Sequence, residues 1–547
     1  PVWTPGSYLV REFERQVQSF AAKDVSGREL QWRKVNKNTW RIETKGADEI
    51  VVTYSVYANE FSVRTNELND EHAFWNNAAL LMYPAGGLKA PSTLKVVPYG
   101  DWQIATGLAP VANQPNTFRA ENFDVLYDSP FEVGNFQTLE FEVKGIPHRI
   151  VINGGPGNYD PERLRRDVQK IVETTGKVYG NKFPYRDYTF ILNLRTAGSG
   201  NGLEHVNSTA LIYKPFGFRA EADYHDFLQL AAHEHFHAWN VKTIRPDALG
   251  PFDYTAENYT RLLWVAEGVT DYYGYLMVQR AGLMTDAQFL SQFASSIQDL
   301  QNRPGRFETS LEEASFDAWI KYYRQDENAV NNQISYYDKG RIVGLLLDLT
   351  IRKASKGARS LDDVMRYLNE EFALRNRNYT PQDFQRAAER AAGASLEDFF
   401  VKYVRGREEL DYNSALAAVG LRLDTTGTAT APRAYFGATL AQTGERLLVR
   451  NVRAGTPAYD HGISFDDQII ALDGLRVNLV EWDARLAEKK PGDKINITVF
   501  RRDRLRQLEV TLGARVVAPY NITRAQQPDA DQQRLYQDWM NAPLMKK

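Results

Sequence analysis

Residues 231–240 contain the pattern His-Glu-x-x-His, with histidines at 233 and 237 and a glutamate at 234. On a helix, side chains four positions apart lie on the same face, so His233 and His237 can bind one metal ion. Glu234 would stand beside that ion, where a carboxylate can take a proton from a water molecule. The pattern therefore predicts a hydrolytic metal centre, with Glu234 as its general base.

The residues around the pattern favour a metal site over a chance match or over ordinary hydrogen-bonded core histidines. Five of the 8 histidines fall between residues 205 and 237, and the apolar residues at 227–232 predict a buried helix. We expect His235, which faces elsewhere on that helix, to be structural.

A tetrahedral zinc site with catalytic function needs a third protein ligand and leaves its fourth position to water. Residues 258–274 predict a second amphipathic helix, in which Glu267 follows the apolar residues 264–266. We expect Glu267 to be the third ligand. Asp271, one turn later, can accept the outer N–H of a ligating histidine and fix its tautomer. The alternative, that both are solvated surface charges, fits poorly with their apolar neighbours.

A helix carrying Trp-x-x-Glu-Gly after a His-Glu-x-x-His helix resembles the gluzincin metallopeptidases. Residues 200–205, Gly-Asn-Gly-Leu-Glu-His, are similar to the Gly-x-Met-Glu-Asn exopeptidase motif of zinc aminopeptidases, and residues 335–340 resemble their Tyr-Glu-Lys-Gly segment. The resemblance implies that Gly202 and Glu204 bind the substrate and that Tyr337 is the catalytic phenol. Tyr336 is the alternative donor, and an endopeptidase is the alternative if Glu204 is an ordinary loop acid.

Three further segments narrow the resemblance. His-Glu-His-Phe-His-Ala-Trp-Asn at 233–240, Val-Trp-Thr-Pro-Gly-Ser-Tyr at 2–8 and a PDZ-like segment near the C-terminus together resemble the glycyl aminopeptidase family. The resemblance implies a Zn²⁺-dependent aminopeptidase that removes N-terminal Gly or Ala from peptides with a free N-terminus.

The chain of 547 residues is too long for one hydrophobic core, so we expect a multidomain α+β protein. Residues 1–160 alternate as strands do, at 30–35, 50–57 and 139–143 for example, and predict a β-sandwich. Residues 161–408 predict a mainly helical, thermolysin-like peptidase domain, with strands at 188–194 and 208–213 ahead of the metal helix. An edge of that small sheet could pair with an extended substrate.

Residues 409–516 are expected to form a PDZ-like domain, entered through a linker at 425–432, and residues 517–547 a helical or loose tail. The segments 435–438, 454–458 and 466–474 resemble PDZ loops. The resemblance implies that the loop at Phe436 and Gly437 binds a peptide C-terminus through backbone N–H groups. The groove could instead hold the protein's own chain or pack on the catalytic domain.

Composition excludes several other functions. A net charge of -3 gives no basic field for nucleic acid, and the absence of cysteine excludes thiol catalysis and cysteine-bound metal. The sequence contains no run of 18 apolar residues, so we expect no membrane-spanning helix. The first residues, beginning with Pro1, do not have the pattern of a secretory leader, although one could have been removed. The family resemblance suggests a periplasmic or secreted protein, with a cytoplasmic location as the alternative.

Two rival functions stay open. One is a zinc endopeptidase, or another gluzincin hydrolase with the same metal ligands. The other is a PDZ-type peptide-binding protein with a vestigial metal site.

Overall fold

The computed structural model describes residues 1–427, 431–516 and 518–545. The chain divides into two compact units whose segments alternate along the sequence. The first unit comprises residues 1–262, 270–285 and 361–391, and the second comprises residues 263–269, 286–360 and 392–547.

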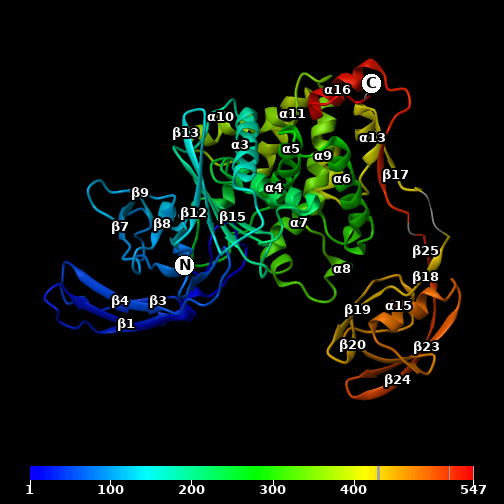
Figure 1. Cartoon of the computed structure of the whole chain (residues 1–547), viewed down its shortest axis with the longest axis horizontal. Helices are drawn as coiled ribbons and strands as arrows, with labels where there is room; N and C mark the ends of the chain where they lie inside the picture. Colours follow the sequence, from blue (N-terminus) through cyan, green and yellow to red (C-terminus); the bar gives the residue numbers. More distant parts are fainter. Residues whose placement is uncertain (428–430, 517, 546–547) are drawn as a thin grey trace. The chain divides into compact units, whose positions relative to one another are not determined.

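The N-terminal region of the first unit is rich in β-strands, as predicted (Figure 1). Two two-stranded sheets pair β1 (Val17–Asp24) with β4 (Ile50–Val56) and β2 (Trp32–Asn36) with β3 (Thr39–Ile42). A three-stranded sheet contains β7 (Ser92–Lys95), β10 (Thr117–Ala120) and β9 (Ala109–Pro110). A four-stranded sheet contains β5 (Asn66–Leu68), β6 (His72–Trp75), β11 (Phe131–Gly134) and β8 (Gln103–Thr106). Short helices η1 (Phe13–Gln16), α1 (Asn77–Leu80) and α2 (Phe123–Tyr127) connect them.

A five-stranded sheet lies next along the chain, in the order β12-β13-β14-β16-β15. Its strands are β12 (Gln137–Val143), β13 (Ile146–Asn153), β14 (Tyr188–Leu194), β15 (Asn201–Glu204) and β16 (Ser208–Tyr213). Strands β13, β14 and β16 are parallel and β14 is buried along its whole length, whereas β15 is an antiparallel edge strand. The edge that carries residues 200–205 therefore belongs to the sheet against which the helix at residues 221–236 packs.

The strand predicted at 139–143 does not belong to the N-terminal domain. It is β12, which forms a hairpin with β13, and β13 in turn pairs with β14 of the catalytic sheet. The turn residues Lys144 and Gly145 both have positive φ, as a two-residue hairpin requires. Alternation of apolar residues predicts a strand but does not indicate which sheet the strand joins.

The long helices of the first unit are α3 (Pro161–Val178), α4 (Glu221–Phe236), α5 (Thr270–Arg280), α10 (Leu361–Glu371) and α11 (Pro381–Ala392). The short helices η2 (Asp247–Leu249) and η7 (Ala373–Arg375) also belong to this unit. Helix α3 begins at a proline, after an Asp160 side chain that accepts a hydrogen bond from the Arg163 N–H. Helices α4 and α5 pack together, and the rings of Phe236 and Tyr273 stack with centroids 4.2 Å apart.

The helical part of the second unit begins with a π-helix, η3 (Trp264–Val269). The long helices that follow are α6 (Asp286–Gln301) and α9 (Asp338–Ala354). Shorter helices are η4 (Pro304–Phe307), α7 (Leu311–Phe316), η5 (Asp317–Trp319), η6 (Tyr322–Arg324), α8 (Ala329–Asn332), α12 (Glu397–Phe400), η8 (Val401–Arg405), α13 (Tyr412–Leu416) and η9 (Ala417–Val419). Residues 258–262, which we expected to be helical, precede the helix, which starts at Leu263.

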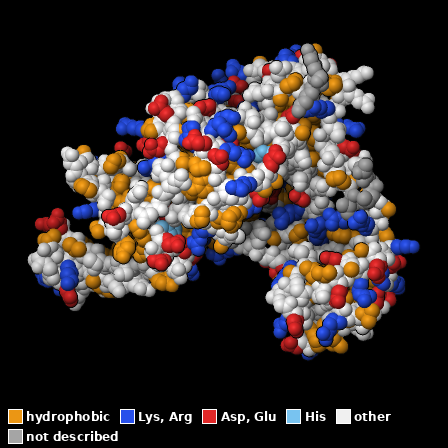
Figure 2. All heavy atoms as spheres, viewed as in Figure 1, with side chains coloured by type: hydrophobic (Ala, Val, Ile, Leu, Met, Phe, Trp, Pro, Cys, Tyr) orange, Lys and Arg blue, Asp and Glu red, His pale blue; other side chains and the backbone are white. Residues whose placement is uncertain are grey.

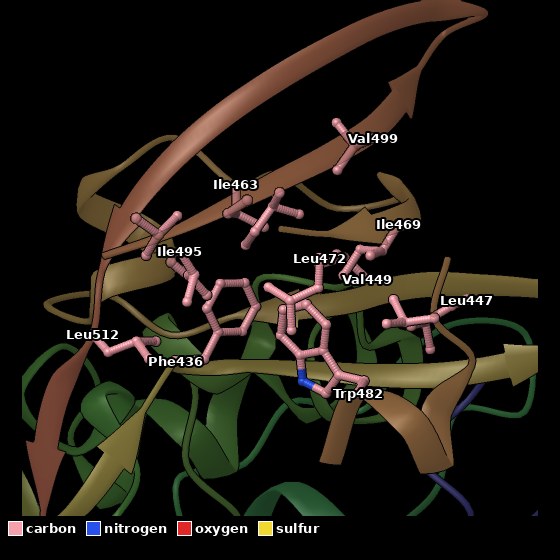
Figure 3. Packing of buried hydrophobic residues seen from close by; sticks show 14 residues of the cluster. Phe436, Leu447, Val449, Ile463, Ile469, Leu472, Trp482, Ile495, Val499 and Leu512 are labelled. Carbon is pink, nitrogen blue, oxygen red and sulfur yellow. The ribbon is translucent and has the colours of Figure 1, made fainter. Parts of the chain in front are cut away.

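Residues 433–515 form the PDZ fold. Its strands are β18 (Arg433–Tyr435), β19 (Ala438–Thr443), β20 (Arg446–Val452), β21 (Gln468–Leu472), β22 (Leu475–Arg476), β23 (Lys494–Arg501), β24 (Arg504–Thr511) and β25 (Gly513–Arg515), and its helices are α14 (Pro457–Asp460) and α15 (Leu479–Ala487). Figure 3 shows their shared core, in which Phe436 and Trp482 pack edge to face with ring centroids 5.0 Å apart.

The segment predicted as a tail is an ordered part of the second unit. Strand β26 (Asn521–Arg524) pairs with β17 (Leu421–Asp424), and helix α16 (Ala530–Met540) buries Leu535, Tyr536, Trp539 and Met540. The structure has the helical alternative of that prediction. Its burial was not expected, because residues 524–533 are polar and the apolar positions of α16 lie in the last two turns. Residues 428–430 of the predicted linker and residues 517, 546 and 547 of the later part lie outside the described residues.

Charged side chains of both signs are spread over the visible face (Figure 2), in keeping with a net charge of -3. Within the described residues, no helix combines the length and apolarity needed to cross a bilayer.

Candidate metal centre and active site

Two buried imidazoles face each other at the end of α4. The Nε2 atoms of His233 and His237 lie 3.0 Å apart, and the exposed fractions of the two residues are 7% and 1%. The Nδ1 atom of His237 lies 2.6 Å from the carbonyl oxygen of Asn240, and that of His233 lies 3.4 Å from Oδ1 of Asp271. The acceptor at Nδ1 of His237 places the proton of that ring on Nδ1 and leaves its Nε2 atom with a lone pair, and the nearby Asp271 carboxylate favours the same tautomer of His233.

Two nitrogen lone pairs at this distance repel each other unless a cation lies between them. Zinc–nitrogen bonds of about 2.0–2.1 Å at tetrahedral angles separate two nitrogens by roughly 3.3 Å. The donor set and its spacing therefore fit a divalent cation.

Glu267 is the third member of a group of residues that could hold a metal ion. One ligand atom from each of His233, His237 and Glu267 lies within 4.8 Å of the other two. Glu267 is on the π-helix η3 and is 2% exposed. Single π-turns occur preferentially at functional sites, where the extra residue in the turn re-aims a side chain.

Asp271 is held in place on α5. Its Oδ1 atom accepts a hydrogen bond of 2.7 Å from Nε2 of Gln229, a residue of α4, and lies near Nδ1 of His233. Gly274 allows this approach, since a Cβ there would lie 3.3 Å from Cβ of His233. The role of Asp271 as the acceptor that orients His233 stays a prediction.

Glu234 lies against the edge strand β15. A Cβ at Gly202 would meet Oε1 of Glu234 at 2.1 Å, so only a glycine leaves room for that carboxylate. Ligand atoms of Glu204, Glu234 and His237 also lie within 4.8 Å of one another. The structure thus brings together the expected base, the expected amine anchor and one metal ligand.

Tyr337 is the residue before α9 and lies within electrostatic reach of Glu267. Burial raises its pKa well above the ordinary value, and the negative charge of Glu267 raises it further. The phenol therefore stays protonated and can donate a hydrogen bond. Tyr337 is partly exposed, whereas Tyr336 is 0% exposed and belongs to the core, which favours Tyr337 as the phenol that meets a substrate.

Two glycines explain why Glu267 and Tyr337 lie close together. A Cβ at Gly268 would come within 2.6 Å of the Cα of Gly340 and of the backbone oxygen of Tyr336. The backbones of η3 and α9 therefore touch, which places the carboxylate of one beside the phenol of the other.

His235 is structural, as its place on the helix predicted. Its Nε2 atom lies 2.7 Å from the hydroxyl of Tyr185, and burial lowers its pKa well below the ordinary value, which keeps it neutral.

A buried ion pair that no sequence pattern indicated holds the segment after Glu204. The carboxylate of Asp128 lies 2.5 Å from Nζ of Lys242 and 3.3 Å from Nδ1 of His205, and it accepts a hydrogen bond of 2.8 Å from the Val206 N–H. Burial alone would raise the pKa of Asp128, but Lys242 and His205 outweigh it and lower the pKa to about 2. No spacing in the sequence links Asp128 to residues 205, 206 and 242, because the contact is made only by the fold.

Asn240 and Gly6 were missed as well. Asn240 belongs to the motif at 233–240, yet it acts through its backbone oxygen, which sequence patterns do not display. Gly6 lies in the Trp-Thr-Pro-Gly segment and contacts Glu204. A tight Pro-Gly turn was the only signal that pointed to it.

In the PDZ domain, Phe436 points into the core and Gly437 has a φ of 95°. The oxygen of Gly437 accepts hydrogen bonds from the Arg453 N–H at 3.1 Å and from Oγ1 of Thr456 at 3.3 Å. These bonds fix the loop that precedes β19, the strand expected to pair with a bound peptide.

Comparisons with known families match three parts of the chain. Residues 226–343 match the M61 glycyl aminopeptidase family, residues 1–135 match the peptidase M61 N-terminal domain, and residues 434–512 match the PDZ domain. A search of curated proteins gave no match.

Among solved structures, an aminopeptidase N family protein from Idiomarina loihiensis is 31% identical, with a TM-score of 0.90, over 99% of this chain and 94% of that chain. An M1 zinc metallopeptidase from Deinococcus radiodurans is 12% identical, with a TM-score of 0.46, over 72% of this chain and 85% of that chain. A mutant of that enzyme with a bound Tyr-Ser-Ala substrate is 15% identical, with a TM-score of 0.45, over 72% and 88%. The last two likenesses are too weak to support an argument.

The first of these structures spans almost the whole chain, and the three family matches fall on the N-terminal, catalytic and C-terminal regions described above. The chain therefore belongs to the M61 glycyl aminopeptidase family and is a metallo-aminopeptidase with a C-terminal PDZ domain.

Proposed function

We propose that this metallo-aminopeptidase uses zinc to activate water and removes small N-terminal residues, Gly or Ala, from peptides. The observation that carries the proposal is the position of Glu204, a carboxylate that is 4% exposed and within 4.8 Å of ligand atoms of Glu234 and His237. A buried carboxylate next to the reacting groups is suited to bind a free ammonium through a charge-assisted hydrogen bond.

His233, His237 and Glu267 would hold the zinc ion. When bound there, zinc lowers the pKa of a water molecule to about 7 and polarises the scissile carbonyl group. Two imidazoles and one carboxylate would also bind cobalt or manganese. Elemental analysis of the purified protein identifies which metal is bound.

The chain's own residues supply the remaining functions. Glu234 accepts a proton from water and delivers it to the leaving amine, and the contact with Gly202 limits where its carboxylate can lie. Tyr337 donates its phenolic hydrogen to the oxygen on which negative charge develops. The edge strand β15 can pair with the extended backbone of the substrate, which would align the first peptide bond with these groups.

The decisive assay compares substrates that differ only at the N-terminus. Glycyl and alanyl anilides with a free amine should be cleaved, whereas their N-acetylated forms and internally quenched peptides should not. Cleavage of the blocked substrates would show that Glu204 does not bind the free amine of the substrate, and it would favour an endopeptidase.

We further propose that the PDZ domain binds a peptide C-terminus at the Phe436–Gly437 loop. Support comes from the fixed conformation of that loop and from the adjacent strand β19. Calorimetry with peptides that carry a free or an amidated C-terminus tests this proposal, because only the free carboxylate should bind.

A further inference from the structure

The N-terminal segment, residues 2–8, is anchored in the first unit. The Val2 N–H donates to the backbone oxygen of Tyr254 at 2.8 Å, and Nε1 of Trp3 donates to that of Asp253 at 2.8 Å. Both Val2 and Trp3 are almost fully buried, with exposed fractions of 1% and 0%. The segment is therefore an integral part of the fold.

A tight turn in this segment meets Glu204. The Ser7 N–H donates to the oxygen of Thr4 at 3.1 Å, and Gly6, with a φ of 81°, follows Pro5 as in a type II turn. A Cβ at Gly6 would lie 2.6 Å from both carboxylate oxygens of Glu204 and 2.6 Å from Cδ1 of Leu203. The carboxylate therefore occupies the space that any larger residue at position 6 would need.

The buried Oε1 atom of Glu204 is suited to accept a hydrogen bond from a cation. Among the residues that the structure describes, no donor lies within hydrogen-bond distance of its Oε1 atom. Leaving such a buried oxygen unsatisfied costs about 1–3 kcal/mol, and more for a charged group. A primary ammonium supplies the missing donor.

The space beside Glu204 is small. A cavity of about 10 Å³ is lined by Glu204, by Trp3, Pro5, Gly6 and Tyr8 of the segment, and on its other walls by Val241, Lys242, Arg245, Leu249 and Phe252. This volume accommodates roughly one water molecule, which is close to the size of a methyl group.

We propose that residues 2–8 form the wall of the subsite for the first residue of the substrate. In this subsite Gly6 positions the Glu204 carboxylate, and residues 2–8 limit the side chain of the substrate's first residue to hydrogen or methyl. The ligand class is a primary ammonium on a carbon that carries no more than one small substituent. This inference rests on the proposed aminopeptidase function.

The test of positioning is Gly6→Ala, with Gly86→Ala as the matched control. Gly86 also has a φ of 81°, and the Gly87 N–H donates to the oxygen of Pro84 at 2.7 Å, so it occupies an equivalent turn. A Cβ at Gly86 meets nothing within 4 Å. Both variants carry the same backbone strain, and only Gly6→Ala displaces Glu204.

Gly6→Ala should lower kcat/KM for glycyl anilide by about 10- to 100-fold relative to Gly86→Ala, at equal metal content and equal Tm, because a charge-assisted hydrogen bond is weakened. On a Glu234→Gln background, which cannot turn over, calorimetry should show weaker binding of triglycine by a similar factor. Equal kcat/KM and equal triglycine affinity in the two variants would overturn the proposal.

The test of size uses Leu249→Ala, with Val241→Ala as a second variant in case the first fails to fold. Each should raise the ratio of kcat/KM for leucyl over glycyl anilide by about 10-fold, the discrimination expected for one or two methylene groups. An unchanged ratio in both folded variants contradicts the size limit. Cleavage of N-acetylated substrates by the unaltered protein would instead refute the proposed function, whatever the Gly6 variants do.

Discussion

At the scale of single residues, the roles of Glu234 and Tyr337 are separable by experiment. Replacing Glu234 by Gln keeps the volume of the side chain and removes the base, so metal content should be unchanged while kcat falls by about a hundredfold or more. Kinetics and elemental analysis of the same sample check this outcome. Loss of metal from Glu234→Gln would make Glu234 a ligand and not a base.

Tyr337→Phe should lower kcat by about a hundredfold with little change in KM, because the phenol donates mainly in the transition state. Tyr336→Phe is the control, since that neighbouring ring is buried in the core. A fall in kcat for Tyr336→Phe and not for Tyr337→Phe would exchange the two assignments. A rise in KM alone would make Tyr337 a substrate-binding residue.

The candidate metal ligands were the site residues that the sequence indicated most directly, because His-Glu-x-x-His has a helical spacing and Glu267 lies in an apolar stretch. The residues that contact these candidate ligands could be predicted from the sequence only in part. Asp271 followed from helix periodicity, whereas Asn240 acts through a backbone oxygen and Gly6 through its lack of a side chain. A sequence pattern shows neither which backbone oxygen accepts a hydrogen bond nor which glycine leaves space for a neighbouring side chain.

At the scale of elements, Asp128, which follows α2, joins two other segments. Its carboxylate contacts His205 and Val206 in the loop after β15 and Lys242 in the segment after α4. The pKa of Asp128 is lowered from 3.8 to about 2, so its ionised form stabilises the fold by about 2 kcal/mol above pH 4. That contribution is lost as the pH falls from 4 through 2, because protonation then occurs in both the folded and the unfolded chain.

Asp128→Asn leaves the Lys242 ammonium, with an exposed side-chain fraction of 3%, buried without its counter-charge. The free energy of unfolding at pH 7 should fall by about 3–5 kcal/mol, and the difference from the unaltered protein should shrink towards pH 2. Denaturant unfolding at several pH values measures both. Asp531→Asn, which removes a carboxylate with an 82% exposed side chain, should show neither effect.

The contact between η3 and α9 could not be foreseen from the sequence. Helical periodicity predicted a helix through residues 258–274, but it could not distinguish a π-turn from an α-turn at Glu267, because both bury the same apolar residues. Likewise, Gly268 and Gly340 lie 72 positions apart, and only the packed structure shows that their backbones touch.

At the scale of the whole molecule, the order of β-rich, helical and PDZ regions was predicted and confirmed. The C-terminal segment was not, because most of its burial comes from the last two turns of α16. Trp539 is 0% exposed, and its ring packs edge to face against Phe289 at 5.7 Å. Trp539→Ala should therefore lower the free energy of unfolding by about 3–5 kcal/mol, measured by denaturant titration. A change below about 1 kcal/mol would show that α16 is a dispensable tail.

Metal removal should also be visible in the stability of the protein. A ligand that binds only the folded state stabilises it by about 4 kcal/mol when its concentration is 1,000 times Kd. Dialysis against a chelator should lower Tm as well as abolish activity, and added zinc should restore both. His233→Ala should lower Tm in the same way and show no further loss on chelation. An unchanged Tm after complete removal of the metal would contradict the lone-pair argument for His233 and His237.

Two chain connections lead to the PDZ domain, one from β17 to β18 and one from β25 to β26. The strands at each end of these connections are paired, because β17 pairs with β26 and β18 pairs with β25. A protease that cuts only one connection would leave the other intact and the strand pairs closed. Nicked enzyme should then run as two fragments on a denaturing gel yet elute as a single species in gel filtration, so a broken polypeptide could keep both its hydrolytic and its peptide-binding parts together.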